Sequence, residues 1–90
     1  MIKWYTELAM KIIVYSRNFC AWCDDVKNFL KNNKIEFEER DVAKNKEYLE
    51  EMVKKSGQQF VPTIDIDGDI LADADASAVE KFLKQKGIIK

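Results

Sequence analysis

The sequence predicts an α/β domain with a four-stranded mixed sheet and about three helices, in the order β-α-β-α-β-β-α. Three observations support this prediction. A segment with helical spacing separates the first two apolar runs, which makes those two strands parallel. A two-residue turn, Asp67-Gly68, joins the last two strands and makes them antiparallel. The length of 90 residues fits one domain.

A change of period marks the first strand and the first helix. Residues 12–15 are a short, β-branched apolar run, typical of a buried strand in the centre of a sheet. Val26, Phe29 and Leu30 then recur at helical spacing. Asn32-Asn33 ends this predicted helix.

The second strand and the second helix repeat the pattern. Apolar residues alternate at Ile35 and Phe37, and together with residues 40–42 they predict a strand. Helical spacing returns over residues 49–53, and Ser56-Gly57 supplies a stop. The chain therefore contains a second helix between the second and third strands.

The last third of the chain predicts a hairpin and a helix. Isoleucines alternate with Asp65 and Asp67 over residues 64–67, which predicts a strand with one solvated face. After the turn at Gly68, residues 69–71 pair back on it. Helical spacing over residues 79–83 predicts the final helix. Ser77 and Glu80 predict a capping box at its start.

Composition excludes several classes of function. Fifteen basic and sixteen acidic residues give a net charge of −1, which provides no general attraction for nucleic acid or an anionic membrane. The absence of histidine excludes imidazole triads and histidine-bound metals, and two cysteines exclude a four-cysteine zinc site within one chain. No apolar run approaches the roughly 18 residues of a membrane span.

The first ten residues carry no signal-peptide pattern and no evident chemistry. We therefore expect residues 1–10 to be a short N-terminal extension and residues 11–90 to form the domain. Two closely spaced cysteines in a chain without a targeting signal favour a cytoplasmic location and redox or catalytic chemistry over a structural disulfide.

The chemistry is concentrated in Cys20-Ala21-Trp22-Cys23, a C-x-x-C motif between a strand and a helix. At this spacing the two sulfurs share one helical face and can form a disulfide with little backbone movement. Cys20 falls near the helix N-terminus, where unpaired N–H groups and the helix dipole favour a thiolate. Cys23, one turn inside, is expected to be more shielded and suits a resolving role. Arg17, three residues before Cys20, adds positive charge. This context indicates a thioredoxin-like redox motif.

Pro62, the only proline, opens the third predicted strand. A cis bond before it would turn the Val61 backbone outward. That backbone could then pair with an extended thiol-containing ligand by strand addition.

The chain from Lys11 to Leu83 resembles the glutaredoxins and glutaredoxin-like redoxins of the thioredoxin superfamily. The matching segments are Val14-Tyr15-Ser16, the cysteine motif, Val61-Pro62 and Ile66-Asp67-Gly68. The resemblance implies the thioredoxin-like fold and a cis Val61–Pro62 bond beside the redox pair. It also implies Cys20 as the nucleophile and Cys23 as the resolving thiol.

The resemblance also implies substrate-binding residues. Arg17 matches the basic residue that precedes the motif in the family, and Asp75 matches its acidic residue before the last helix. Phe19, Trp22 and the Val61 backbone are expected to dock the substrate beside Ala21 and Pro62.

Four departures from the family pattern concern the redox motif and glutathione binding. Ala21 and Trp22 replace Pro-Tyr, Gln59 replaces an arginine, Phe60 replaces a threonine, and Ala72-Asp73 replace two glycines. A Cβ at Ala72 and a carboxylate at Asp73 would crowd and repel the carboxylate of glutathione. The dithiol chemistry is unaffected by this change.

We therefore predict a monomeric thiol-disulfide oxidoreductase that reduces protein or mixed disulfides, with no tightly bound cofactor and glutathione as a candidate co-substrate. An alternative is a redoxin that thioredoxin reductase reduces and that donates electrons to ribonucleotide reductase. An alternative of another class is a dimeric module in which two chains supply four thiolates to an iron–sulfur cluster or a metal.

Overall fold

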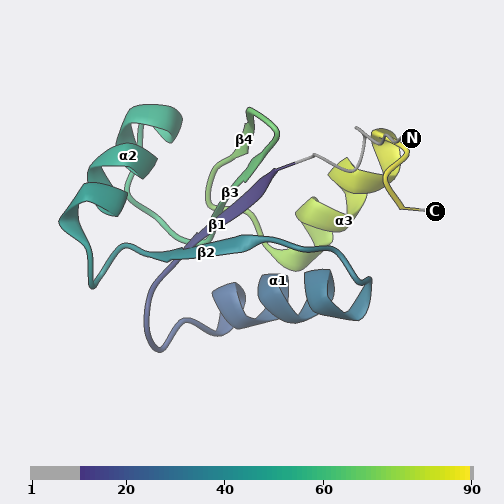
Figure 1. The fold of residues 1–90 in the computed structure, drawn as a ribbon, viewed down its shortest axis with the longest axis horizontal. Coiled ribbons are helices and arrows are strands. Elements are labelled where there is room, and N and C mark those ends of the chain that lie inside the picture. Colours follow the sequence, from purple (N-terminus) through teal and green to yellow (C-terminus); the bar gives the residue numbers. More distant parts are fainter. Residues whose placement is uncertain (1–10, 90) are drawn as a thin grey trace, which may run out of the picture.

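The computed structural model of the protein describes residues 11–89 and has the predicted order of strands and helices (Figure 1). Four strands form one mixed sheet in the order β2-β1-β3-β4. The strands are β1 (Ile12–Ser16), β2 (Glu38–Asp41), β3 (Thr63–Ile66) and β4 (Asp69–Leu71). The helices are α1 (Ala21–Asn32), α2 (Lys46–Ser56) and α3 (Ala76–Gln85). The predicted extension over residues 1–10 lies outside the described residues.

The sheet topology follows the sequence prediction. Strand β1 lies in the interior of the sheet, parallel to β2 and antiparallel to β3. Strand β4 pairs antiparallel with β3 across the Asp67-Gly68 turn. Both turn residues have positive φ angles, 53° and 99°, as the favoured two-residue hairpin turn requires. These pairings place the carboxyl end of β1 beside the amino end of β3.

Helices cover both faces of the sheet. Strand residues Ile12 and Val14 face one core, which the sheet shares with α1 and α3. Ile13 and Tyr15 alternate with them and face a second, smaller core under α2, where Met52 is fully buried. Figure 1 shows α1 and α2 on opposite sides of the sheet. Because both faces are covered, the interior strands β1 and β3 are buried along their whole length.

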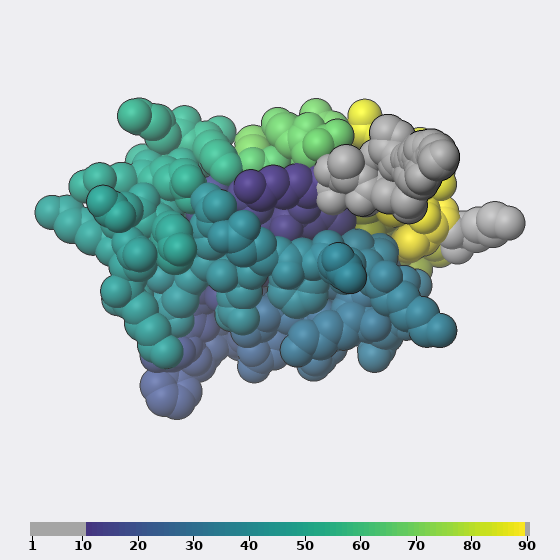
Figure 2. All heavy atoms as spheres, viewed as in Figure 1, coloured from purple at the N-terminus to yellow at the C-terminus, as the bar shows by residue number. Residues whose placement is uncertain are grey.

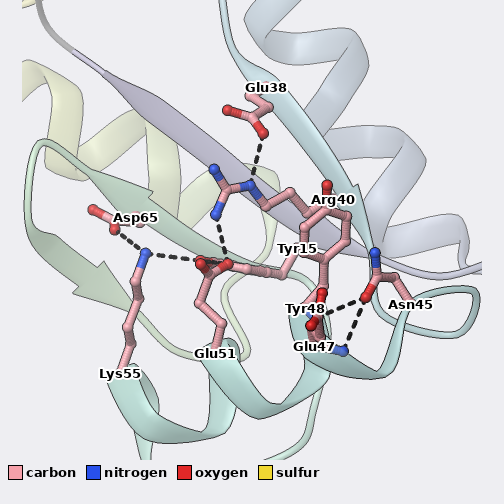
Figure 3. A network of polar contacts seen from close by, with 9 residues as sticks. All are labelled: Tyr15, Glu38, Arg40, Asn45, Glu47, Tyr48, Glu51, Lys55 and Asp65. Carbon is pink, nitrogen blue, oxygen red and sulfur yellow. Dashed lines mark hydrogen bonds and ion pairs between the residues drawn. The ribbon is translucent and has the colours of Figure 1, made fainter.

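The prediction that Asp65 lies on a solvated face is wrong. Asp65 is 8% exposed, because its face of β3 lies under α2. Lys55 of α2 donates hydrogen bonds to the Asp65 carboxylate and to the Tyr15 hydroxyl, each at 2.7 Å (Figure 3). The Tyr15 hydroxyl in turn donates to Glu51 at 2.8 Å. The alternating pattern therefore marks two differently buried faces, one apolar and one polar.

The ion pairs of this network shift the titration of its members. Burial opposes the charged form of Lys55, yet its hydrogen bonds to Asp65 and Tyr15 hold its pKa above the usual range. Burial also opposes ionisation of Glu51, but hydrogen bonds from Arg40 and Tyr15 keep its pKa below the usual range. The network thus fastens α2 to β1, β2 and β3 with charged groups (Figure 3).

Two predicted element boundaries are also wrong. Strand β2 begins at Glu38, so Ile35 and Phe37 precede it and pack against the core of α1 and α3. The reason is that α1 ends in a tight turn, in which the Ile35 N–H donates to the Leu30 carbonyl. The capping box at Ser77 and Glu80 is not formed. The helix begins one residue before Ser77, and the Asp75 carboxylate caps it by accepting from the Ala78 N–H.

The start of α1 is fixed against the edge of the sheet. Glu39 of β2 accepts hydrogen bonds from Ser16 Oγ and from Lys27 Nζ of α1, both at 2.7 Å. These two hydrogen bonds hold the pKa of Glu39 below its usual range. The contact joins the ends of β1 and β2 to the second turn of α1. It thereby holds the preceding β1–α1 connection, which protrudes at the lower edge of the molecule in Figure 2.

Candidate active site

Cys20 is the N-cap residue of α1, as the sequence predicts. Its backbone is extended, with φ of −116° and ψ of 101°. Its sulfur accepts a hydrogen bond from the Cys23 N–H at 3.1 Å, and its carbonyl accepts one from the Asp24 N–H. An N-cap side chain satisfies backbone N–H groups that have no partner within the helix. The Cys20 sulfur therefore occupies the position at which the helix best stabilises negative charge.

The two cysteines differ in exposure. They form a disulfide, with their Cα atoms 5.2 Å apart. Cys23 is fully buried under the first turn of α1, whereas Cys20 is half-buried at the surface. This confirms the predicted shielding of Cys23. Cys20 is therefore the more accessible of the two cysteines.

A cleft with a volume of about 410 Å³ lies next to the C-x-x-C motif; its lining includes Trp22 of the motif and neither cysteine. Trp22, between the two cysteines, forms one wall, and the cis Val61–Pro62 peptide forms another. The loop after β4 completes the cleft with Asp73 and Asp75. The cis bond expected from the family resemblance is thus present. The cleft joins segments that lie about forty residues apart in the sequence.

The cleft includes five of the predicted substrate-binding residues: Trp22, Val61, Pro62, Asp73 and Asp75. Arg17, Phe19, Ala21 and Gln59 do not line it, and all four are exposed. The Phe19 side chain is fully exposed, and its backbone has a positive φ of 57°. These four residues surround the site without forming its walls.

Sequence analysis missed Ala74 and Ala78, which also line the cleft. Alanines carry no chemical signature, so their types gave no signal. The cap of α3 would have supplied one. If Asp75 is assigned as the N-cap, its carboxylate accepts a hydrogen bond from the Ala78 N–H. Ala78 then lies beside Asp75, which was already a predicted site residue.

Thr63 is a second missed residue, and it holds the two loop walls together. Its fully buried hydroxyl donates to the Phe60 carbonyl at 2.7 Å and accepts from the Gln58 amide at 3.0 Å. The Asp73 N–H approaches the same oxygen at 3.4 Å. A backbone hydrogen bond from Ala74 to the Pro62 carbonyl, at 2.9 Å, runs beside this contact. One hydroxyl thus links the segment before the cis proline to the loop after β4.

Replacement of Thr63 by valine should loosen this connection. Valine keeps the shape but removes the hydroxyl that pairs with the Phe60 carbonyl and the Gln58 amide, at a cost of about 1–2 kcal/mol in the free energy of unfolding. The Gln58 amide keeps its hydrogen bond to Ser56. Chemical denaturation measures this loss, and the serine variant should retain most of the wild-type stability. Equal losses in the valine and serine variants would show that the threonine methyl group, and not the hydroxyl, stabilises the loops.

Within residues 11–89, no group of three or more histidine, cysteine, aspartate or glutamate side chains is arranged to hold a metal ion. No helix in the same range has the length and apolar character needed to cross a membrane.

Comparisons with known proteins agree with this geometry. The glutaredoxin family model matches residues 12–71. A glutaredoxin-like 8.6 kDa protein of the Clostridium pasteurianum rubredoxin operon is 35% identical over 74 residues, 82% of this chain and 99% of its own length. Glutaredoxin 3 of Escherichia coli is 32% identical over 62 residues, 69% of this chain and 75% of its own.

Solved structures extend the likeness to the fold. The crystal structure of the thioredoxin-like protein BC3987 superposes with a TM-score of 0.75 and 33% identity. The match covers 81% of this chain and all of that one. The four-stranded mixed sheet with three helices is therefore the thioredoxin-like fold. With its C-x-x-C disulfide at a helix N-terminus beside a cis proline, this chain belongs to the glutaredoxin family.

Proposed function

We propose that the protein is a dithiol oxidoreductase that reduces protein or mixed disulfides, with Cys20 as the nucleophile and Cys23 as the resolving thiol. Membership of the glutaredoxin family supports thiol-disulfide exchange in general terms. The observation that carries the finer assignment is the N-cap geometry. The half-buried Cys20 sulfur accepts the Cys23 N–H, while the Cys23 side chain is fully buried.

The reaction proceeds in two exchange steps. The Cys20 thiolate attacks one sulfur of the substrate disulfide, forms a mixed disulfide and expels the other sulfur as a thiolate. The Cys23 thiolate then attacks the Cys20 sulfur and releases the second substrate thiolate. The substrate gains two electrons, and the enzyme is left with the Cys20–Cys23 disulfide. Cys23 loses its thiol proton to water before it attacks, and water passes the protons lost by the two enzyme thiols to the two released thiolates.

The backbone of Val61 is suited to dock an extended substrate. Within residues 11–89 neither its N–H nor its carbonyl has a hydrogen-bond partner, and β3 begins only at Thr63. A substrate strand could pair there by main-chain hydrogen bonds. Trp22 lines the same cleft and is 61% exposed, so its indole can cover the bound segment.

The enzyme is regenerated by an external electron donor. We place thioredoxin reductase before glutathione in this role. Asp73, which stands where the family has a glycine, lines the cleft and would repel a carboxylate of glutathione. This proposal places the protein, as a monomer, in the cytoplasm, where dithiols are kept reduced.

Intact-mass analysis of the Cys23→Ser variant tests the assignment. Incubated with oxidised glutathione, the variant should form a mixed disulfide at Cys20 that persists, because no resolving thiol is present. Slow adduct formation, together with fast alkylation of Cys20 by iodoacetamide, would support a reactive thiol without a glutathione site. Absence of both reactions would contradict the proposed nucleophile. Coupled NADPH oxidation with thioredoxin reductase then tests the donor.

A further inference from the structure

We propose that Asp73 sets the substrate preference of the cleft, favouring disulfides that carry a positive charge close to the sulfur over neutral or acidic ones. This inference rests on the proposed function, since it concerns the disulfide that Cys20 attacks. The favoured substrates are disulfides of amino thiols, or disulfides of polypeptide cysteines that are flanked by lysine or arginine.

The charges of the cleft wall have one sign. Of the residues within 11–89 that line the cleft, the charged ones are Asp73 and Asp75. One carboxylate oxygen of Asp75 already accepts the Ala78 N–H at the start of α3, so this side chain has less capacity to bind a ligand. The Asp73 carboxylate makes no hydrogen bond or ion pair with residues 11–89, and the residue is exposed. Asp73 is therefore the carboxylate with the most capacity to meet a ligand.

The position of Asp73 is held by the walls of the cleft. Its φ angle of 51° places it in the left-handed region, which aspartate tolerates better than most residues. Its N–H approaches Thr63 Oγ1, and the next residue, Ala74, donates its N–H to the Pro62 carbonyl at 2.9 Å. The carboxylate thus belongs to a loop that is tied to the peptide beside the redox pair.

The wall formed by Trp22 favours the same ligand charge. An indole face attracts an ammonium or guanidinium group within about 6 Å of its centre. Trp22 is 61% exposed and immediately precedes the buried Cys23. A cation bound between Trp22 and Asp73 would lie close to the sulfur that Cys20 attacks. The negative charge of an acidic disulfide would be repelled by the Asp73 carboxylate.

Single-turnover exchange with three small disulfides tests this inference. The enzyme is reduced, desalted and mixed with cystamine (cationic), hydroxyethyl disulfide (neutral) or dithiodiglycolate (anionic). Each reaction reduces one disulfide to two thiols as Cys20 and Cys23 form their own disulfide. Samples are quenched and alkylated, and intact-mass spectrometry gives the fractions of reduced and oxidised enzyme. Each disulfide has its own intrinsic reactivity, so the quantity compared is the rate ratio of variant to wild type for each reagent.

Asp73→Asn should lower the rate with cystamine roughly threefold at low salt and raise the rate with dithiodiglycolate by a similar factor. The rate with hydroxyethyl disulfide, which carries no charge, should change less than either of these two rates. The matched control is Asp67→Asn at the other end of β4, because Asp67 also has a positive φ, 53°, and loses the same charge. At about 0.5 M salt the effects of Asp73→Asn should shrink.

Two results would overturn the inference. One is an equal change for all three disulfides in Asp73→Asn, which would indicate a general distortion of the site. The other is the same charge dependence in Asp67→Asn, which would indicate the overall field of the protein. A wild-type enzyme that reduces none of the three disulfides would instead contradict the proposed function.

Discussion

Replacement of Cys20 by serine should abolish disulfide exchange, lowering its rate by roughly 10³-fold or more. A serine hydroxyl is not ionised at neutral pH and does not attack a disulfide sulfur. Serine is itself a strong N-cap residue, so α1 should keep its first turn. The measurement is the rate of hydroxyethyl disulfide reduction, with dithiothreitol regenerating the enzyme.

Cys23→Ser is the matched control for this loss. It keeps the N-capping Cys20 sulfur and should still carry out the first exchange step, while the second step fails. Thermal unfolding of both variants should be compared with that of the reduced wild type, so that a folding defect is not mistaken for lost chemistry. If Cys20→Ser kept the wild-type rate, Cys23 or another group would be the nucleophile.

The sequence predicted the fold well where local chemistry determines the backbone. Asp67-Gly68 is a turn in which both residues need a positive φ, and few other pairs adopt it readily, so the hairpin was predictable. The position of Cys20 at the start of α1 was equally predictable, because the period of the apolar residues changes there. Parallel pairing of β1 and β2 then followed from the intervening helix.

The errors arose where tertiary contacts determine the environment of a residue. Asp65 alternates with isoleucines as a solvated residue would, yet a lysine from α2 covers and neutralises it. That lysine is ten residues away, on another element, and nothing in the local pattern marks it. Ser77 competed with Asp75 for the cap of α3, and both residue types are strong N-caps.

Of the residues that form the cleft, only those with a reactive or family-specific side chain could be predicted from the sequence. The cysteine motif and the proline indicated two of its walls, and the family resemblance indicated the acidic loop. The contacts that bring these walls together were not visible in the sequence. Thr63 joins them through one hydroxyl, and a lone threonine in a strand indicates only β propensity.

Lys55→Met should lower the free energy of unfolding by about 2–3 kcal/mol, because the Asp65 carboxylate keeps its burial but loses its cation. Methionine retains much of the aliphatic stem of lysine. The side chains of Lys55 and Asp65 are 29% and 12% exposed, so water cannot fully replace the lost hydrogen bond. Lys55 also donates to the Tyr15 hydroxyl, which would lose this partner as well.

Urea denaturation of three variants separates this partly buried pair from an ordinary surface pair. Lys84→Met removes an exposed pair with Glu80, whose side chains are 50% and 44% exposed, and should cost less than about 0.5 kcal/mol. Lys55→Met/Asp65→Asn should recover part of the loss of Lys55→Met. Asparagine removes the unpaired charge and keeps an oxygen for the Gly68 N–H, which Asp65 accepts at 2.8 Å. If the double variant were no more stable than Lys55→Met, the cost would lie in lost packing of the lysine stem and not in an uncompensated carboxylate.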